Sequence, residues 1–234
     1  MSDFFNFEKK GIDFPFYNHI PEITKSRWLL LLISIPIATL VYGLDIFGSE
    51  FISSILFCLI MLIPLLYVAN WDYKLFFQKP TTRELGLAVL LFIGYMLYSI
   101  IMDYVLLSPT GTTSPDLVST INIEMLVSLI FSMMAEELTK FIPFIFLMRV
   151  FFKYSENRKF SLVLSAFIVM LGFGLMHYDF FDPNVGSLIS VLLLQGLGSI
   201  FEFYGLIKTK NILVSYTTHL LTDAFIMILI LLGF

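Results

Sequence analysis

The segment INIEMLVSLIFSMMAEELTKFIPFIFLMRVFF carries three ionisable residues within an apolar stretch, where charged side chains are rare and often functional. Glu136 and Glu137 are adjacent, and Lys140 follows one turn later. Because Glu136 and Lys140 are spaced i, i+4, we expect them to share a helix face and to pair. Pro143 predicts a kink beside them. A purely structural ion pair between helices is the alternative, although two acids need more than one lysine.

Two histidines lie in other apolar stretches, each with a characteristic neighbour. The segment LGFGLMHYDFF places Phe173 and His177 at i, i+4, and NILVSYTTHLLTDAF places His219 and Asp223 at the same spacing. A carboxyl one turn from an imidazole can orient the ring or share a proton with it. Each motif alone also fits a packed histidine or a hydrogen-bonded clamp between helices. None of these polar faces tolerates lipid, so we expect the three segments to converge on a hydrated cavity.

Such a cavity offers hydrolytic chemistry. A glutamate and an imidazole around one water can deprotonate it for attack on a carbonyl, and further donors can stabilise the oxyanion. A second route is a zinc ion held by Glu136, His177 and His219 with one position open for water. The sequence leaves both routes open, zinc-dependent and metal-free. The HExxH and GxSxG motifs are absent, and Cys58, the only cysteine, has no histidine nearby in sequence.

The composition predicts the setting of this chemistry. Of the 234 residues, 58% are hydrophobic and 14% are charged, and the mean hydropathy is +0.90. A soluble chain of this composition would expose large apolar patches, so we expect an integral membrane protein with the lipid bilayer as its partner. A single cysteine excludes a disulfide scaffold, and a net charge of −4 without a basic block argues against nucleic acid as a partner.

Apolar stretches of about 20 residues predict an all-α, polytopic membrane helix bundle of about seven transmembrane helices, within a range of six to eight. We divide the chain into a cytoplasmic or interfacial arm over 1–26, three first transmembrane helices over 27–120, and a core that carries the ionisable motifs over 121–234. No stretch is typical of a cleavable signal peptide. The predicted spans are 27–47, 51–69, 85–107, 121–148, 161–180, 186–207 and 211–233.

The basic residues predict the orientation. Thirteen of the 14 fall before the first span or in alternate connections, and the fourteenth is Lys140. Because Lys and Arg near span ends stay on the cytoplasmic side, the N-terminus is predicted to be cytoplasmic and the C-terminus to lie outside. A prokaryotic plasma membrane fits this pattern, and the oligomeric state stays open.

The motifs over roughly residues 121–231 resemble the CAAX prenyl protease and bacteriocin-processing group of intramembrane glutamate proteases, the Abi or CPBP family. That family carries a double glutamate, then FxxxH, then HxxxN or HxxxD, on separate membrane helices. The resemblance implies that Glu136 activates water with His177, that His219 and Asp223 stabilise the oxyanion, and that Glu137 is a supporting acid.

Two departures from the family pattern bear on activity. The family usually reads EExxxR, whereas Phe141 stands at the arginine position and Lys140 precedes it, a spacing closer to the PrsW-type proteases. A cation beside Glu136 would lower the basicity of that carboxylate. Asp223 stands where asparagine is common, and an ionised carboxylate cannot donate to an oxyanion.

The resulting hypothesis is an intramembrane endopeptidase that cleaves a peptide or protein substrate near the cytoplasmic membrane face. The alternative is a catalytically inactive membrane partner, such as a bacteriocin-immunity protein or a sensor scaffold, which the two departures favour. A proton-coupled transporter is a third hypothesis, and the absence of inverted repeats with interrupted helices argues against it.

Overall fold

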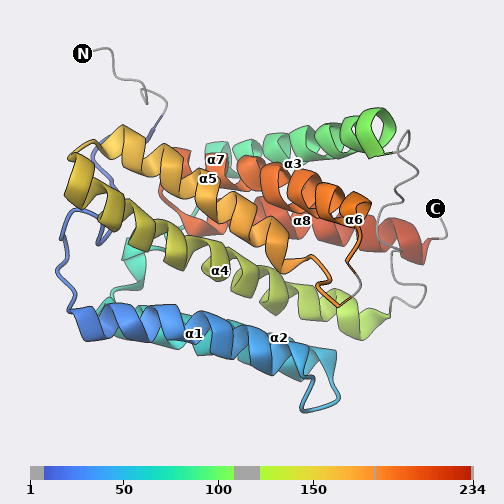
Figure 1. The fold of residues 1–234 in the computed structure, drawn as a ribbon, viewed down its shortest axis with the longest axis horizontal. Helices are drawn as coiled ribbons and strands as arrows, with labels where there is room; N and C mark the ends of the chain where they lie inside the picture. Colours follow the sequence, from blue (N-terminus) through green and yellow to red (C-terminus); the bar gives the residue numbers. More distant parts are fainter. Residues whose placement is uncertain (1–7, 108–121, 182, 233–234) are drawn as a thin grey trace.

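The computed structural model describes residues 8–107, 122–181 and 183–232, and its regular elements over these ranges are all helices. The helices run back and forth along one long axis and form a multi-pass membrane bundle (Figure 1). This confirms the predicted fold class. The predicted connection 108–120 lies outside the described residues.

Six helical segments of the described chain are long and apolar enough to cross a membrane. The remaining predicted span, 121–148, corresponds to α4 (Ile123–Ser155), which is 33 residues long and carries the ionisable cluster in its middle. The six are α1 (Lys25–Gly43), α2 (Glu50–Val68), α3 (Thr82–Met102), α5 (Arg158–Met176), the interrupted segment that ends with α7 (Ile200–Thr209), and α8 (Ile212–Leu231).

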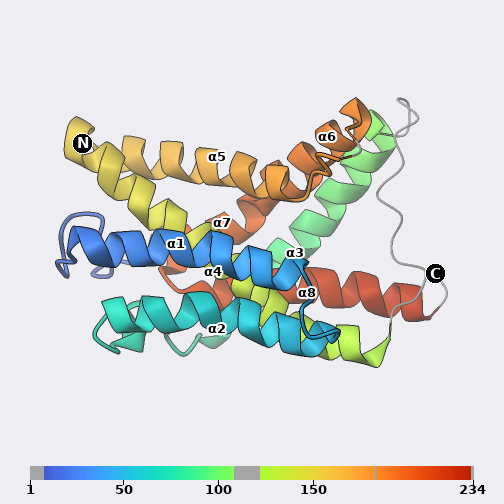
Figure 2. The ribbon, with the colours of Figure 1, turned by 60° about the horizontal axis from the view of Figure 1, so that its bottom comes forward.

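Helix α4 is the central element of the bundle. It contacts α1, α2, α5 and α8; it lies between α5 and the α1–α2 pair in Figure 1 and passes behind α1 in the view of Figure 2. Its first turn is capped by the Asn122 side chain, which accepts a hydrogen bond from the Met125 amide. The ionisable residues of α4 are therefore surrounded by other helices, which removes their charges from lipid.

The sixth predicted span is not one continuous α-helix. It consists of α6 (Val185–Val191), the π-helical turn η4 (Leu192–Gly196), the 3₁₀ turn η5 (Leu197–Ser199) and α7. The interruption coincides with a close crossing of α5, because a Cβ on Gly174 would lie 2.8 Å from the Val191 carbonyl oxygen and 2.9 Å from Gly196 Cα. Glycine pairs of this kind allow membrane helices to approach at backbone distance.

The described part of the N-terminal arm folds onto the end of the bundle where α1 and α5 begin. Phe14, Phe16 and Tyr17 are buried, and the Phe16 ring packs edge-on against Trp28 at 6.1 Å between centroids. Aromatic burial therefore fixes this part of the arm to the bundle, despite the charges interspersed along it.

Ion pairs fix the arm to the same end. Arg158 pairs with Asp13 and Glu8, each at 2.8 Å, and Lys210 also contacts Glu8. Burial alone would raise the pKa of Asp13, but the hydrogen bonds from Arg158 and Tyr17 outweigh it and hold that pKa below its usual value. Burial, together with the bond to Asp13, raises the pKa of Tyr17 to about 12.

Candidate functional site

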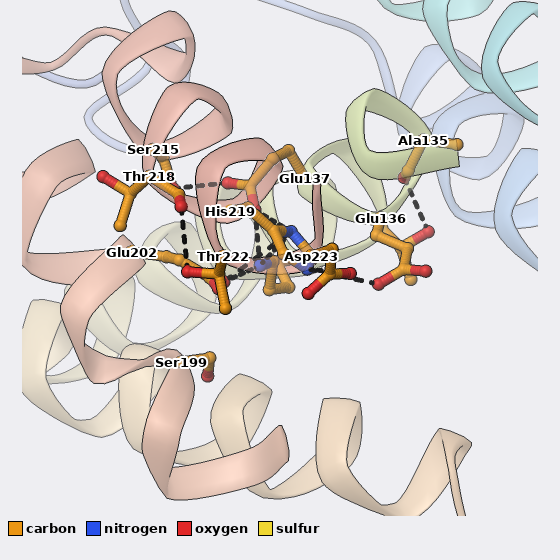
Figure 3. Close-up of polar contacts among 12 residues, drawn as sticks. Ala135, Glu136, Glu137, Ser199, Glu202, Ser215, Thr218, His219, Thr222 and Asp223 are labelled. Carbon is orange, nitrogen blue, oxygen red and sulfur yellow. Dashed lines mark hydrogen bonds and ion pairs between the residues drawn. The ribbon is translucent and has the colours of Figure 1, made fainter. Parts of the chain in front are cut away.

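The ionisable residues singled out from the sequence meet inside the bundle, where α4, α5, α7 and α8 come together. Glu136 lies 13 residues, about 20 Å, into α4, and His219 lies seven residues, about 10 Å, into α8. Figure 3 shows His219 and Asp223 between Glu136 on one side and Glu202 on the other. The predicted convergence of separate spans on one polar interior is present in the structure.

A buried group of charges forms the inner part of the site. Glu137 receives hydrogen bonds from the Ser215 hydroxyl and from His219 Nδ1, the latter at 2.9 Å, and its Oε1 lies 2.5 Å from Lys140 Nζ. Lys140 also bonds Glu202 on α7. We call Glu137, Lys140, Glu202 and Ser215 the inner cluster, and it joins α4, α7 and α8.

The predicted pairing of Lys140 with Glu136 is wrong. Lys140 pairs with Glu137 at i, i+3 and with Glu202, because the rotation of α4 directs both Glu137 and Lys140 toward α7 and α8. Helical spacing allows i, i+3 and i, i+4 contacts equally, so tertiary packing decides between them. The Lys140 ammonium therefore pairs with Glu137 and Glu202 and not with Glu136.

Glu202 on α7 also belongs to the site, although the motifs named in the sequence do not include it. The structure buries Glu202 against Lys140 and brings its Oε2 to 4.0 Å from His219 Nδ1. The available signal was an intramembrane acid without a partner in its own helix. A buried acid of this kind calls for a cation from elsewhere in the bundle.

Within the described chain, the donors that lie within 4.8 Å of one another are those of Glu137, Glu202 and His219, a spacing that suits a metal ion. This set differs from the predicted one of Glu136, His177 and His219. Lys140 Nζ already contacts all three members, at 2.5 Å from Glu137, at bonding distance from Glu202 and at 3.4 Å from His219. The ammonium thus occupies the place a metal cation would take.

A second set of groups, which we call the accessible face, consists of Glu136, His177 and Asp223. Their side chains are 20%, 32% and 34% exposed, against 3% for Glu137 and for Lys140. Glu136 Oε2 lies 3.7 Å from His219 Nε2 and 4.0 Å from His177 Nε2. These separations exceed a direct hydrogen bond, so the groups face a common space without bonding one another.

His219 joins the two sets. Its Nδ1 bonds the inner cluster through Glu137, and its Nε2 is directed to the accessible face, at 3.7 Å from both Glu136 and Asp223. The Glu137 carboxylate therefore holds the proton on Nδ1 and fixes the ring orientation. The inner cluster determines which imidazole nitrogen the accessible face receives.

The Nδ1 of His177 also has a hydrogen-bond partner, as that of His219 does. It lies 2.9 Å from the Phe173 carbonyl oxygen, and since a carbonyl can only accept, Nδ1 carries the proton and the Nε2 lone pair points toward Glu136. The two imidazoles thus present their Nε2 atoms to the same oxygen, Glu136 Oε2. A backbone carbonyl and a carboxylate as Nδ1 partners are also the usual supports of metal-bound histidines.

His177 is the C-cap of α5 and not part of its predicted extension to residue 180. The helix ends at Met176, and the His177 and Tyr178 amides close the last turn on the carbonyls of Gly174 and Leu175. The Phe173 ring lies edge-on to His177 at 4.8 Å. His177 therefore lies just beyond the last helical residue of α5, and its ring is positioned by contacts with Phe173.

An apolar groove of about 280 Å³ reaches the same phenylalanine from the membrane side. It is lined by residues of α1, α4 and α5, among them Ile35, Pro143, Gly172, Phe173 and Met176. The Phe173 ring also lies 4.6 Å from Lys140 Nζ. The Phe173 side chain thus lies between the apolar groove and the ionisable residues.

Comparison with protein-family models, with curated proteins and with solved structures finds no match to this chain. The family resemblance drawn from the motifs therefore remains a prediction, and the site must be interpreted from its own geometry.

Proposed function

We propose that the protein is an intramembrane endopeptidase in which Glu136 is the general base. The observation that carries the proposal is the convergence of His177 Nε2 and His219 Nε2 on Glu136 Oε2, at 4.0 and 3.7 Å, on the exposed side of the site. A separation of this size between a carboxylate and two imidazoles suits a reacting water and a carbonyl group. The resemblance to the CPBP family supports the same roles.

In the proposed reaction, the attacking water donates one hydrogen bond to Glu136 and the other to the unprotonated Nε2 of His177. Glu136 removes a proton as the oxygen attacks the peptide carbonyl, and it later returns that proton to the leaving amine, so the proton balance closes. His219, when protonated at Nε2, donates to the oxyanion, and Asp223 orients that nitrogen at 3.7 Å. Asp223 thus acts on the His219 ring and does not itself need to donate a hydrogen bond to the oxyanion.

The pairing of Lys140 bears on the other departure from the family pattern. Because Lys140 is engaged by Glu137 and Glu202, it does not form an ion pair with Glu136, the carboxylate on the accessible face. The lysine that precedes the arginine position of the family pattern therefore belongs to the inner cluster and not to the accessible face.

The donor types of Glu136, His177 and His219 also suit zinc, although these three are not a set of described residues whose donor atoms all lie within 4.8 Å of one another. Imidazole and carboxylate are ligands that zinc prefers, and both Nδ1–H groups have the partners that such histidines usually have. A bound zinc ion would supply Lewis acidity and lower the pKa of water. With zinc bound, Glu136 would be a ligand of the metal, whereas without zinc it would be the free general base.

The surroundings favour a substrate with an apolar segment next to its scissile bond. The groove beside Phe173 is lined mainly by apolar side chains of α1, α4 and α5. A peptide bond would have to reach about 10 Å past the start of α8, the end that the basic residues assign to the cytoplasm. A membrane-anchored tail or a hydrophobic precursor peptide meets both requirements.

The test is cleavage of a library of apolar-tailed peptides by the purified, reconstituted protein, with and without a chelator. Glu136→Gln should reduce the cleavage rate by about 10²-fold or more while leaving the protein folded. Loss of activity with the chelator, together with stoichiometric zinc, would select the metal route. Full activity of Glu136→Gln would refute the proposal.

The inner cluster favours a second candidate, a catalytically inactive membrane partner. Glu137, Lys140 and Glu202 connect three helices and need no chemistry to explain them. In that case a cellular phenotype would survive the combined loss of Glu136 and His177 at unchanged expression. The exposure of the accessible face is the observation that this candidate leaves unexplained.

A further inference from the structure

A second pocket, of about 410 Å³, lies at the end of the bundle that the basic residues assign to the cytoplasm. It is formed between the first half of α1 and the last turns of α4, far along α4 from Glu136. We call it the basic pocket. It shares no lining residue with the candidate active site or with the apolar groove.

Three permanent cations line the basic pocket, and no acidic residue of the described chain does. They are Lys25 on α1 and Arg149 and Lys153 on α4. The structure gives none of the three an ion pair within the described residues. Arg149 donates to the Phe16 carbonyl oxygen at 3.1 Å, which leaves most of its guanidinium donors for another acceptor. The pocket therefore concentrates positive charge without a protein counter-ion.

A buried polar atom of the same pocket also lacks a partner. Trp28 lines the pocket and is only 5% exposed, yet its indole Nε1 has no hydrogen-bond acceptor in the described chain. Buried indole N–H groups are normally satisfied, because an unmet donor costs about 1–3 kcal/mol. An acceptor supplied from outside the chain would satisfy it.

The remaining lining specifies what kind of acceptor. Leu29, Leu32 and Phe146 form the part of the pocket that continues toward the membrane interior, and Leu29 is 58% exposed. A site with cations at the interface and apolar side chains below it matches an amphipathic anion, whose charge stays at the headgroup level and whose chain enters the bilayer.

We propose that the basic pocket binds the phosphate of an anionic phospholipid of the cytoplasmic leaflet. Lys25, Arg149 and Lys153 contact the phosphate, Trp28 Nε1 donates to one of the lipid's oxygen acceptors, and an acyl chain lies along Leu29 and Leu32. The lipid thereby connects α1 to α4, the helix that carries Glu136. This binding is independent of whether the protein cleaves peptides.

The experiment measures the melting temperature of the purified full-length protein in detergent micelles with added dioleoyl phosphatidylglycerol, dioleoyl phosphatidylcholine or inorganic phosphate. We expect phosphatidylglycerol at saturation to raise Tm by about 4 °C or more, and phosphatidylcholine and inorganic phosphate to leave it nearly unchanged. The double variant Lys25→Gln/Lys153→Gln should lose most of the shift. It keeps Arg149, whose bond to Phe16 supports the fold.

The matched control is Lys74→Gln/Lys79→Gln, which removes two exposed cations from the same membrane face outside the pocket. This control should keep the full shift. An equal loss in both double variants would reduce the effect to general surface charge and overturn the proposal. An equal shift with phosphatidylcholine would overturn the requirement for an anion, and a full shift with inorganic phosphate would overturn the requirement for a lipid.

Discussion

The inner cluster and the accessible face each contain a glutamate of α4, but the two sets differ in how their charges are satisfied. In the inner cluster, Glu137 has three partners at bonding distance and is 3% exposed. On the accessible face, Glu136 approaches its imidazole neighbours only to 3.7–4.0 Å and is 20% exposed. Because adjacent residues point about 100° apart on a helix, Glu137 has its hydrogen-bond partners within the bundle, whereas Glu136 has none there among the described residues.

This difference distinguishes stability from chemistry. Buried charges with complete partners hold helices in one arrangement, and removal of one partner leaves the others unpaired at high cost. Charges that face a common space without bonding one another are available to a substrate. We therefore expect substitutions in the inner cluster to affect mainly folding, and those on the accessible face to affect mainly turnover.

The largest expected effect on stability is that of Lys140→Met. The substitution leaves Glu137 and Glu202 buried without their cation, and we expect a loss of about 3–5 kcal/mol of unfolding free energy. Denaturant titration of the purified protein in mixed micelles measures it. Wild-type stability of Lys140→Met would show that the inner cluster does not hold the bundle, and the distinction drawn here would fail.

His219→Asn sharpens the comparison, because His219 contributes to both sets. We expect a stability loss of about 1–3 kcal/mol from the unsatisfied Glu137, together with loss of peptide cleavage. The two effects are measured on the same preparation by denaturant titration and by product formation. If stability alone changed, His219 would belong only to the inner cluster.

Gly174→Ala tests how far the site depends on the crossing that positions α5. The added methyl group meets Val191 O and Gly196 Cα at under 3.0 Å, so the helices must separate, at a cost of about 1–3 kcal/mol. Gly172→Ala is the matched control, since its Cβ would meet no atom within 4 Å. Equal stabilities of the two variants would contradict the close crossing.

The smallest effect is expected at the arm, whose ion pairs are partly solvated. The pKa of Asp13 lies below its usual value of 3.8 in the folded protein, so its contribution to stability is present above that pH and is lost as the pH falls through the lowered pKa. The stability difference between the wild type and Asp13→Asn should therefore shrink below about pH 4. A difference independent of pH from 6 to 2.5 would exclude this contribution.

Much of the fold was predictable because hydrophobic length is a local property of the sequence. The convergence of Glu136, His177, His219 and Asp223 was predictable for a similar reason, since lipid excludes each polar face. The partner of Lys140 was not, because helix rotation depends on packing. The role of Glu202 and the interruption before α7 likewise depend on contacts between helices that are distant in sequence.

The most direct test of the central claim compares Glu136→Gln with Glu137→Gln, which alter neighbouring residues by the same atoms. Cleavage rate and unfolding free energy are measured for both in one reconstituted system. The account predicts that Glu136→Gln loses about 10²-fold or more in rate with nearly unchanged stability, whereas Glu137→Gln loses about 1–3 kcal/mol of stability. Unimpaired cleavage by Glu136→Gln, or an equal loss of stability in both variants, would contradict it.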